Sequence, residues 1–114
     1  MSADLRERLE ADLRAAIREQ QAARISVLRT TLAALSNAEA VDPSAFAPSA
    51  TEVPRRELDD GEIRSIVERE RDELRTTAQR MRRVGADDRA RELLGQARIL
   101  DDYLEDCVGG TTRG

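Results

Sequence analysis

Residues 27–39, VLRTTLAALSNAE, form the longest apolar-rich run in an otherwise charged chain, and this run decides the fold. At about 100° per residue, its large apolar side chains and the preceding isoleucine fall on one narrow stripe, which is typical of an amphipathic helix. Smaller apolar residues form a shoulder beside that stripe. The stripe consists of Ile25, Leu28, Leu32 and Leu35, and the shoulder consists of Val27, Ala34 and Ala38. We expect this helix to be the hub against which other helices pack.

The composition favours a single small helical domain. The chain has 114 residues, of which 37% are charged and 2% aromatic, so its core must be built from Leu, Ile, Val and Ala. Such a core suits helix packing, whereas sheets favour β-branched and aromatic residues. There is no histidine, which removes the commonest general base and zinc ligand. We therefore expect no metal, no cofactor and no catalytic residues.

The cellular context also follows from composition. The single cysteine, Cys107, cannot form an intramolecular disulfide and is interpreted as an incidental small apolar residue. No apolar stretch approaches the length of a membrane span, and the acidic, amphipathic N-terminus is unlike a secretory signal. These features predict a cytoplasmic protein without a membrane association.

Helical periodicity continues on both sides of the central run. It predicts a first helix over residues 3–20, the central helix over 23–40, a third over 60–84 and a fourth over 86–106. The stripe of the first helix is Leu5, Leu9, Leu13, Ala16 and Ile17. We expect an all-α fold, namely an elongated four-helix arrangement with a long antiparallel hairpin of the third and fourth helices. One domain should span residues 1–108, with a proline-rich loop at 41–57 and a flexible tail at 109–114.

The third helix carries the clearest boundary signals. Asp59 and Glu62 fit a capping box, and Leu58 and Ile63 form the matching hydrophobic staple. Gly85 is expected to end the helix in a left-handed conformation. The many carboxylates of this helix alternate with arginines at i, i+3 and i, i+4 spacing, which is typical of a solvated face of salt bridges.

Charge is unevenly distributed along the predicted hairpin. Residues 75–91 hold six arginines against two aspartates, a net charge of +4, whereas residues 92–106 are equally acidic. The arginines nearest the tip are Arg80, Arg82, Arg83, Arg89 and Arg91. Two interpretations remain open: these arginines keep the tip soluble, or they bind phosphates of RNA or groups of another acidic partner. No aromatic residue lies nearby to stack bases, which disfavours sequence-specific reading of single strands.

Three polar residues of the central run each need an interpretation of their own. Glu39 lies on the apolar stripe, so it either marks where the helix leaves the core or is a partly buried carboxylate paired with an arginine. Arg29 is roughly 80° away around the helix, so the partner would come from another helix. Asn37 lies on the outward side, where packing does not account for it.

The assembled pattern resembles the GatB/YqeY family, in particular its YqeY-like bacterial proteins. The matching segments are LRERLEADLRAAIREQ, VLRTTLAALSNAE, LDDGEIRSIVERERDELRTTAQRMRRVGADDRA and ILDDYL, which cover residues 3–104 apart from the proline-rich loop. The resemblance implies an all-helical domain related to tRNA-dependent amidotransferases, which are carbon–nitrogen ligases with glutamine as amide donor. Arg29, Asn37 and Glu39 would then mark a surface that belongs to the family motif.

The resemblance leaves three functions open. Where the family shows Tyr-Leu-Pro before a GatB-like tail domain, this chain has Tyr103-Leu104-Glu105 and stops ten residues after Leu104, so the tail is expected to be absent. The first function is a non-catalytic accessory module that binds tRNA or an amidotransferase-like partner. The alternative is a protein-interaction adaptor or self-associating bundle with no role in nucleic-acid binding. The third is amide transfer from glutamine by this chain itself.

Overall fold

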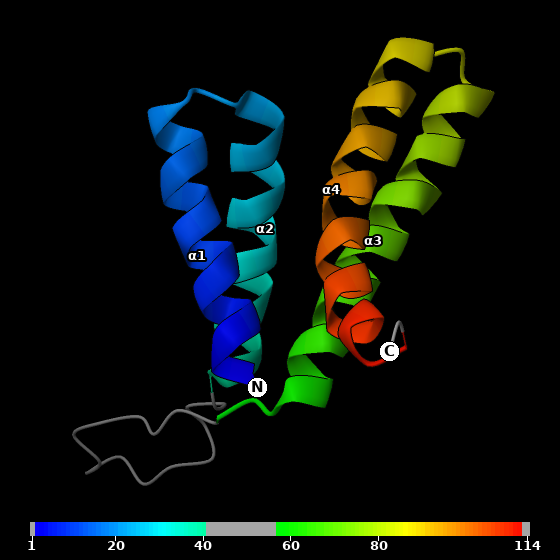
Figure 1. Ribbon diagram of the computed structural model, residues 1–114. Coiled ribbons are helices and arrows are strands. Elements are labelled where there is room, and N and C mark those ends of the chain that lie inside the picture. The colour runs from blue at the N-terminus through cyan, green and yellow to red at the C-terminus, as the bar shows by residue number, and fades with distance from the viewer. Residues whose placement is uncertain (1, 41–56, 113–114) are drawn as a thin grey trace, which may run out of the picture.

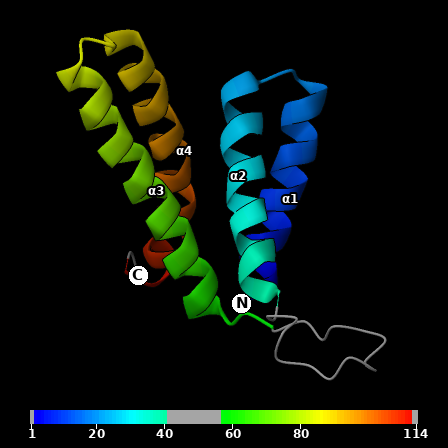
Figure 2. The ribbon, with the colours of Figure 1, turned by 180° about the vertical axis from the view of Figure 1, so that it is seen from behind.

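The computed structural model describes residues 2–40 and 57–112, with side chains placed for 5–40 and 57–105. These residues form α1 (Ser2–Arg18), α2 (Ala22–Glu39), α3 (Asp60–Arg83) and α4 (Asp87–Thr112). The all-α prediction is confirmed. Two antiparallel hairpins, α1–α2 and α3–α4, share one packed end and diverge toward their turns, as the opposite views in Figures 1 and 2 show.

The long hairpin has the boundaries that its sequence signals predict. The Asp59 carboxylate accepts the backbone N–H of Glu62 at 2.8 Å, and the Glu62 carboxylate accepts the N–H of Asp59 at 3.1 Å. Gly85 has a φ of 83°, and the N–H of Ala86 donates to the carbonyl of Met81 at 2.8 Å. This is the six-to-one bond of a Schellman motif, which satisfies a carbonyl that the helix end would otherwise leave unpaired.

The turn of the short hairpin has the same geometry without a glycine. The N–H of Gln21 donates to the carbonyl of Ala16 at 2.9 Å, and Gln20 lies at a φ of 57°. The first helix therefore ends at Arg18, and the expected end at Gln20 was wrong. A left-handed glutamine is strained by about 1–2 kcal/mol, and without a glycine the sequence gives no signal that the chain leaves the helix before this residue.

The core lies at the shared end of the hairpins. Leu9, Leu28, Leu35, Val67 and Leu100 are each fully buried there, and they come from all four helices. Helix α2 contacts each of the other three helices, but so does α3, so the contacts do not single out α2 as the hub. Thr31 of α2 is also fully buried, which the leucine stripe did not predict.

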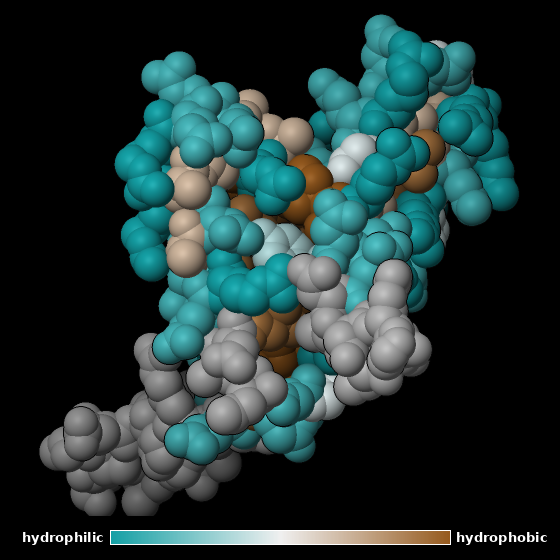
Figure 3. Space-filling view, in the orientation of Figure 1, coloured by the Kyte–Doolittle hydropathy of each residue, from teal (hydrophilic) through white to brown (hydrophobic). Residues whose placement is uncertain are grey.

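A second, smaller core cluster belongs to the long hairpin alone. It consists of Ala78, Ala90 and Leu93, with Leu74 packed against both clusters. The distal half of α3–α4 is thus not covered by α1–α2. The space-filling view shows apolar side chains gathered between the two arms and a hydrophilic exterior (Figure 3).

Two sequence-based expectations about apolar residues and helix ends were wrong. Ile17 was placed on the buried stripe of the first helix, yet 46% of it is exposed, because the hairpins have diverged at its level. Helix α4 continues to Thr112, beyond the expected end at residue 106. Residues 109–112 are therefore helical rather than part of a tail, because glycine weakens a helix without forbidding it.

The proline-rich loop, except for Glu57, and the last two residues of the expected tail lie outside the described residues. The side chain of Cys107 also lies outside them.

Candidate functional site

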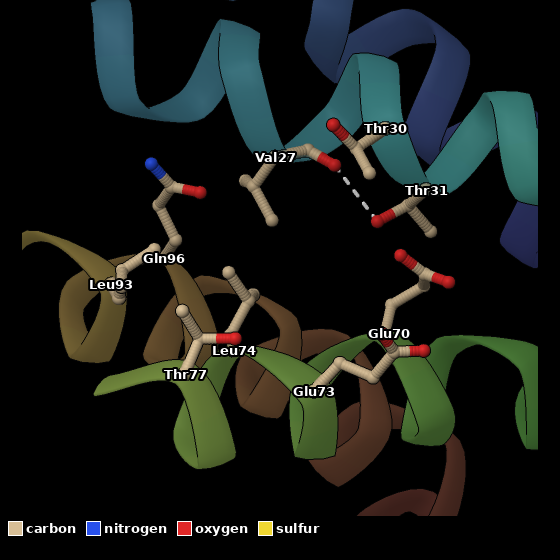
Figure 4. A pocket seen from close by; sticks show the side chains of 9 residues that line it. All are labelled: Val27, Thr30, Thr31, Glu70, Glu73, Leu74, Thr77, Leu93 and Gln96. Carbon is tan, nitrogen blue, oxygen red and sulfur yellow. Dashed lines mark hydrogen bonds between the residues drawn. The ribbon is translucent and has the colours of Figure 1, made fainter. Parts of the chain in front are cut away.

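A concave, partly polar groove lies where the two hairpins diverge. It has a volume of about 200 Å³ and is lined by α2, α3 and α4 (Figure 4). Its floor is apolar, and hydroxyl, amide and carboxylate groups surround that floor. The apolar residues are Val27, Leu74 and Leu93, and the polar ones are Thr30, Thr31, Glu70, Glu73, Thr77 and Gln96.

The hydroxyl groups of the two α2 threonines in the groove donate hydrogen bonds to backbone carbonyls of their own helix. Thr31 donates to the carbonyl of Val27 at 2.8 Å, and Thr30 donates to the carbonyl of Ser26 at 3.0 Å. This bond to the i−4 carbonyl is the usual way in which a helix accommodates threonine. The lone pairs of the two oxygens remain able to accept hydrogen bonds.

Glu70 is the titratable group most affected by the groove. Partial burial raises the pKa of the Glu70 carboxyl, the negative charge of Glu73 raises that pKa further, and Arg69 opposes both effects. Figure 4 shows the Glu70 side chain extending from α3 toward α2, with its carboxylate facing Thr31. In the sequence, Glu70 is one of the many carboxylates of the third helix that alternate with arginines.

The groove contains one candidate general base. This is Glu70, whose carboxyl has a raised pKa, and the hydroxyls of the groove belong to Thr30, Thr31 and Thr77, of which the first two donate to backbone carbonyls. Among the described residues, no three His, Cys, Asp or Glu side chains are placed to hold a metal ion. The described helices include none that is long and apolar enough to cross a membrane.

Glu39 is paired, as one of its two interpretations required. Its carboxylate accepts two hydrogen bonds from the Arg6 guanidinium, one of them at 2.9 Å, so the partner does come from another helix. Only 14% of the Glu39 side chain is exposed. Arg29 and Asn37 are exposed on α2, and the structure does not bring them together with this pair.

The five arginines near the turn of the long hairpin, here named the arginine tip, are all exposed. Arg89 forms an ion pair with Glu92 at 3.1 Å, and Arg91 forms one with Asp88. Arg80 and Arg82 are two residues apart, so they point to nearly opposite sides of α3. The arginines of the tip therefore surround the hairpin end instead of sharing one face.

Sequence reasoning missed a polar bridge between the hairpins. The hydroxyl of Tyr103 in α4 donates to the carboxylate of Asp12 in α1 at 2.5 Å, and the Arg8 guanidinium lies 5.0 Å from the centre of the Tyr103 ring. Burial raises the pKa of Tyr103 most, the Asp12 carboxylate adds to the rise, and Arg24 and Arg8 oppose it. The one available signal was that the buried stripe of α4 contains the only tyrosine of the chain, because a buried hydroxyl needs a partner.

Comparisons of this chain with models of protein families, with curated proteins and with solved structures find no match.

Proposed function

We propose that this chain is a non-catalytic helical module of the GatB/YqeY type that binds tRNA through the arginine tip. The observation that carries the proposal is the exposure of all five arginines of the tip. Arginine binds phosphate oxygens through paired N–H donors, and a patch of arginines attracts a polyanion even when the whole chain is acidic. The resemblance in sequence supplies the choice of tRNA as the polyanion.

The arrangement of the tip supports backbone contacts rather than base recognition. Its arginines surround the hairpin end, and the only tyrosine of the chain is buried far from it. Binding of this kind depends on counterion release, so its affinity falls steeply as salt increases. We expect weak selectivity for base sequence and a strong dependence on salt.

The test measures binding of fluorescently labelled tRNA over a series of salt concentrations. The double substitution Arg82→Glu with Arg83→Glu should abolish binding or reduce the slope of log affinity against log salt by about 2. A matched control, Arg14→Glu with Arg18→Glu, makes the same charge change on the exposed side of α1. No binding at low salt, or equal loss in the control, would contradict the proposal. A glutaminase assay with and without tRNA tests the catalytic alternative.

A second candidate function is a protein-interaction adaptor, and the groove between the hairpins favours it. The groove combines an apolar floor with a polar rim, which is the usual composition of a protein-binding surface. Sedimentation and pull-down experiments separate this function from the first one. A strict monomer that retains no protein would count against it, whatever the result with tRNA.

A further inference from the structure

The groove between α2 and the α3–α4 hairpin presents more hydrogen-bond acceptors than donors. Glu70 and Glu73 contribute carboxylates, which accept and do not donate when ionised. The hydroxyl of Thr30 donates its proton to α2, so its exposed oxygen can only accept, whereas Thr31, which donates in the same way, is fully buried. The remaining polar groups, Thr77 and Gln96, can present a donor or an acceptor as required.

The groove is negatively charged, and no basic residue of its lining neutralises that charge. None of its lining residues is basic, and the two carboxylates are one helical turn apart on α3. Arg69 is close enough to affect Glu70 electrostatically, but it does not line the groove. Phosphates and other anions would be repelled, whereas a cation with several N–H groups would complement both the charge and the acceptors.

The size and surroundings of the groove point to a side chain of a partner protein. A volume of about 200 Å³ lies below the roughly 300–1,000 Å³ that is typical of pockets for drug-sized ligands. Of the three floor residues, Leu74 is partly buried, whereas Val27 and Leu93 are only 2% and 5% exposed, so Leu74 gives the floor most of its accessible apolar surface. A cation carried on an amphipathic helix would also bring apolar neighbours to this floor.

We propose that the groove binds a basic amphipathic helix of a partner protein, with one arginine or lysine side chain held between Glu70 and Glu73. Its apolar residues pack on Leu74, the partly exposed residue of the groove floor. This inference deepens the adaptor function and rests on it, and it is independent of tRNA binding at the arginine tip. The two surfaces share no residue.

The experiment selects binders from a library of helical peptides displayed on phage. Selection uses the full chain, with depletion against the variant Glu70→Gln with Glu73→Gln. We expect enriched peptides to carry an arginine or lysine flanked by apolar residues at i±3 or i±4. Replacing that basic residue with glutamine should weaken binding about tenfold or more, as should the double substitution.

The controls exclude a simple charge effect and a folding defect. Glu92→Gln with Asp102→Asn changes the net charge equally at exposed positions of α4 and should preserve peptide binding. The groove variant should remain folded by circular dichroism, because it removes carboxylates that oppose one another. Its tRNA binding should not weaken, whereas Arg82→Glu with Arg83→Glu should leave peptide binding intact, so the two functions can fail separately.

Several outcomes would overturn the proposal. They are an empty selection, enriched peptides without a basic residue, or binding that survives in the groove variant. Equally tight binding of free N-acetyl-arginine amide would identify a small guanidinium ligand instead of a partner helix. Self-association that the groove variant abolishes would identify a second copy of this chain as the occupant.

Discussion

The bridge between Tyr103 and Asp12 gives the sharpest test of how the two hairpins are held together. The tyrosine hydroxyl donates to a carboxylate of the other hairpin, and only 3% of the tyrosine is exposed. Hydrogen bonds to charged groups contribute about 1.5–3 kcal/mol. Because Asp12 is only partly buried, water can replace part of its lost bond. Tyr103→Phe should therefore lower the free energy of unfolding by about 1–2 kcal/mol.

A double-substitution cycle with Asp12→Asn isolates the bond from other effects of either change. The amide oxygen still accepts from the tyrosine but without a charge, so Asp12→Asn should cost about half as much as Tyr103→Phe. The two changes should be less than additive, because they remove the same contact. Urea unfolding monitored by circular dichroism measures these energies, with an unchanged dependence on urea as the sign that only stability has changed.

The same bond can be observed directly by ultraviolet titration. The chain has one tyrosine and no tryptophan, so the tyrosinate absorbance reports on Tyr103 alone. Its pKa should lie above the ordinary value of 10.0 in the native protein, return to that value in urea, and fall in Asp12→Asn. The unfolded chain loses the proton first as the pH rises. The protonated tyrosine, through its burial first and its bond to Asp12 second, therefore stabilises the fold fully below pH 10.0, and this stability is lost as the pH rises through the native pKa.

Two results would refute this reasoning. One is a native tyrosine that titrates at its ordinary pKa, and the other is a Tyr103→Phe variant as stable as the parent. Either would mean that Asp12 and Tyr103 do not form the bridge in solution.

Three further substitutions test other parts of the structure by urea or thermal unfolding. Gln20→Gly should raise the free energy of unfolding by about 0.5–1 kcal/mol, because glycine adopts a positive φ without strain; a loss would contradict the turn geometry. Glu39→Ala should lower it by about 1–2 kcal/mol, because it leaves the partly buried Arg6 without that partner. The control Glu10→Ala, which removes only a 3.6 Å contact to Arg6, should cost less than about 0.5 kcal/mol, and equal losses would count against the pairing. Glu70→Gln should add about 0.2–0.5 kcal/mol at neutral pH, where the ionised carboxylate is disfavoured. The gain should fade as the pH falls through the raised native pKa and be absent below 4.5; a gain independent of pH would exclude an electrostatic cause.

Local signals were enough to predict the helices and most of the core. The capping box at Asp59 and Glu62 spans four residues, so its geometry depends on almost nothing outside that segment. The leucine stripe of α2 likewise identified Leu28 and Leu35 as fully buried. Periodicity predicts which side of a helix is apolar, and in a small helical protein that side must face the other helices.

The polar pairs between different helices could not be predicted from the sequence, because they depend on how the helices cross. Arg6 and Glu39 are 33 residues apart, and Asp12 and Tyr103 are 91 residues apart. Nothing in one helix specifies which polar residue of another will face it. The prediction that Ile17 is buried was wrong for the same reason. This residue continues the stripe of Leu13, but the hairpins have diverged at that level.

The groove lies where the polar interruptions of two stripes meet, and this coincidence bears on its role. Glu70 follows the buried Ile66 and Val67 on α3, and Thr31 is buried on α2 facing it. An apolar residue in place of Glu70 would extend the contact between the hairpins, whereas the raised pKa of its carboxyl shows that the ionised form is disfavoured there. Residues that oppose folding are expected where they serve binding. If Glu70→Gln stabilises the chain and also abolishes binding of a basic peptide, both effects have one cause, namely a carboxylate that requires a cation from a partner.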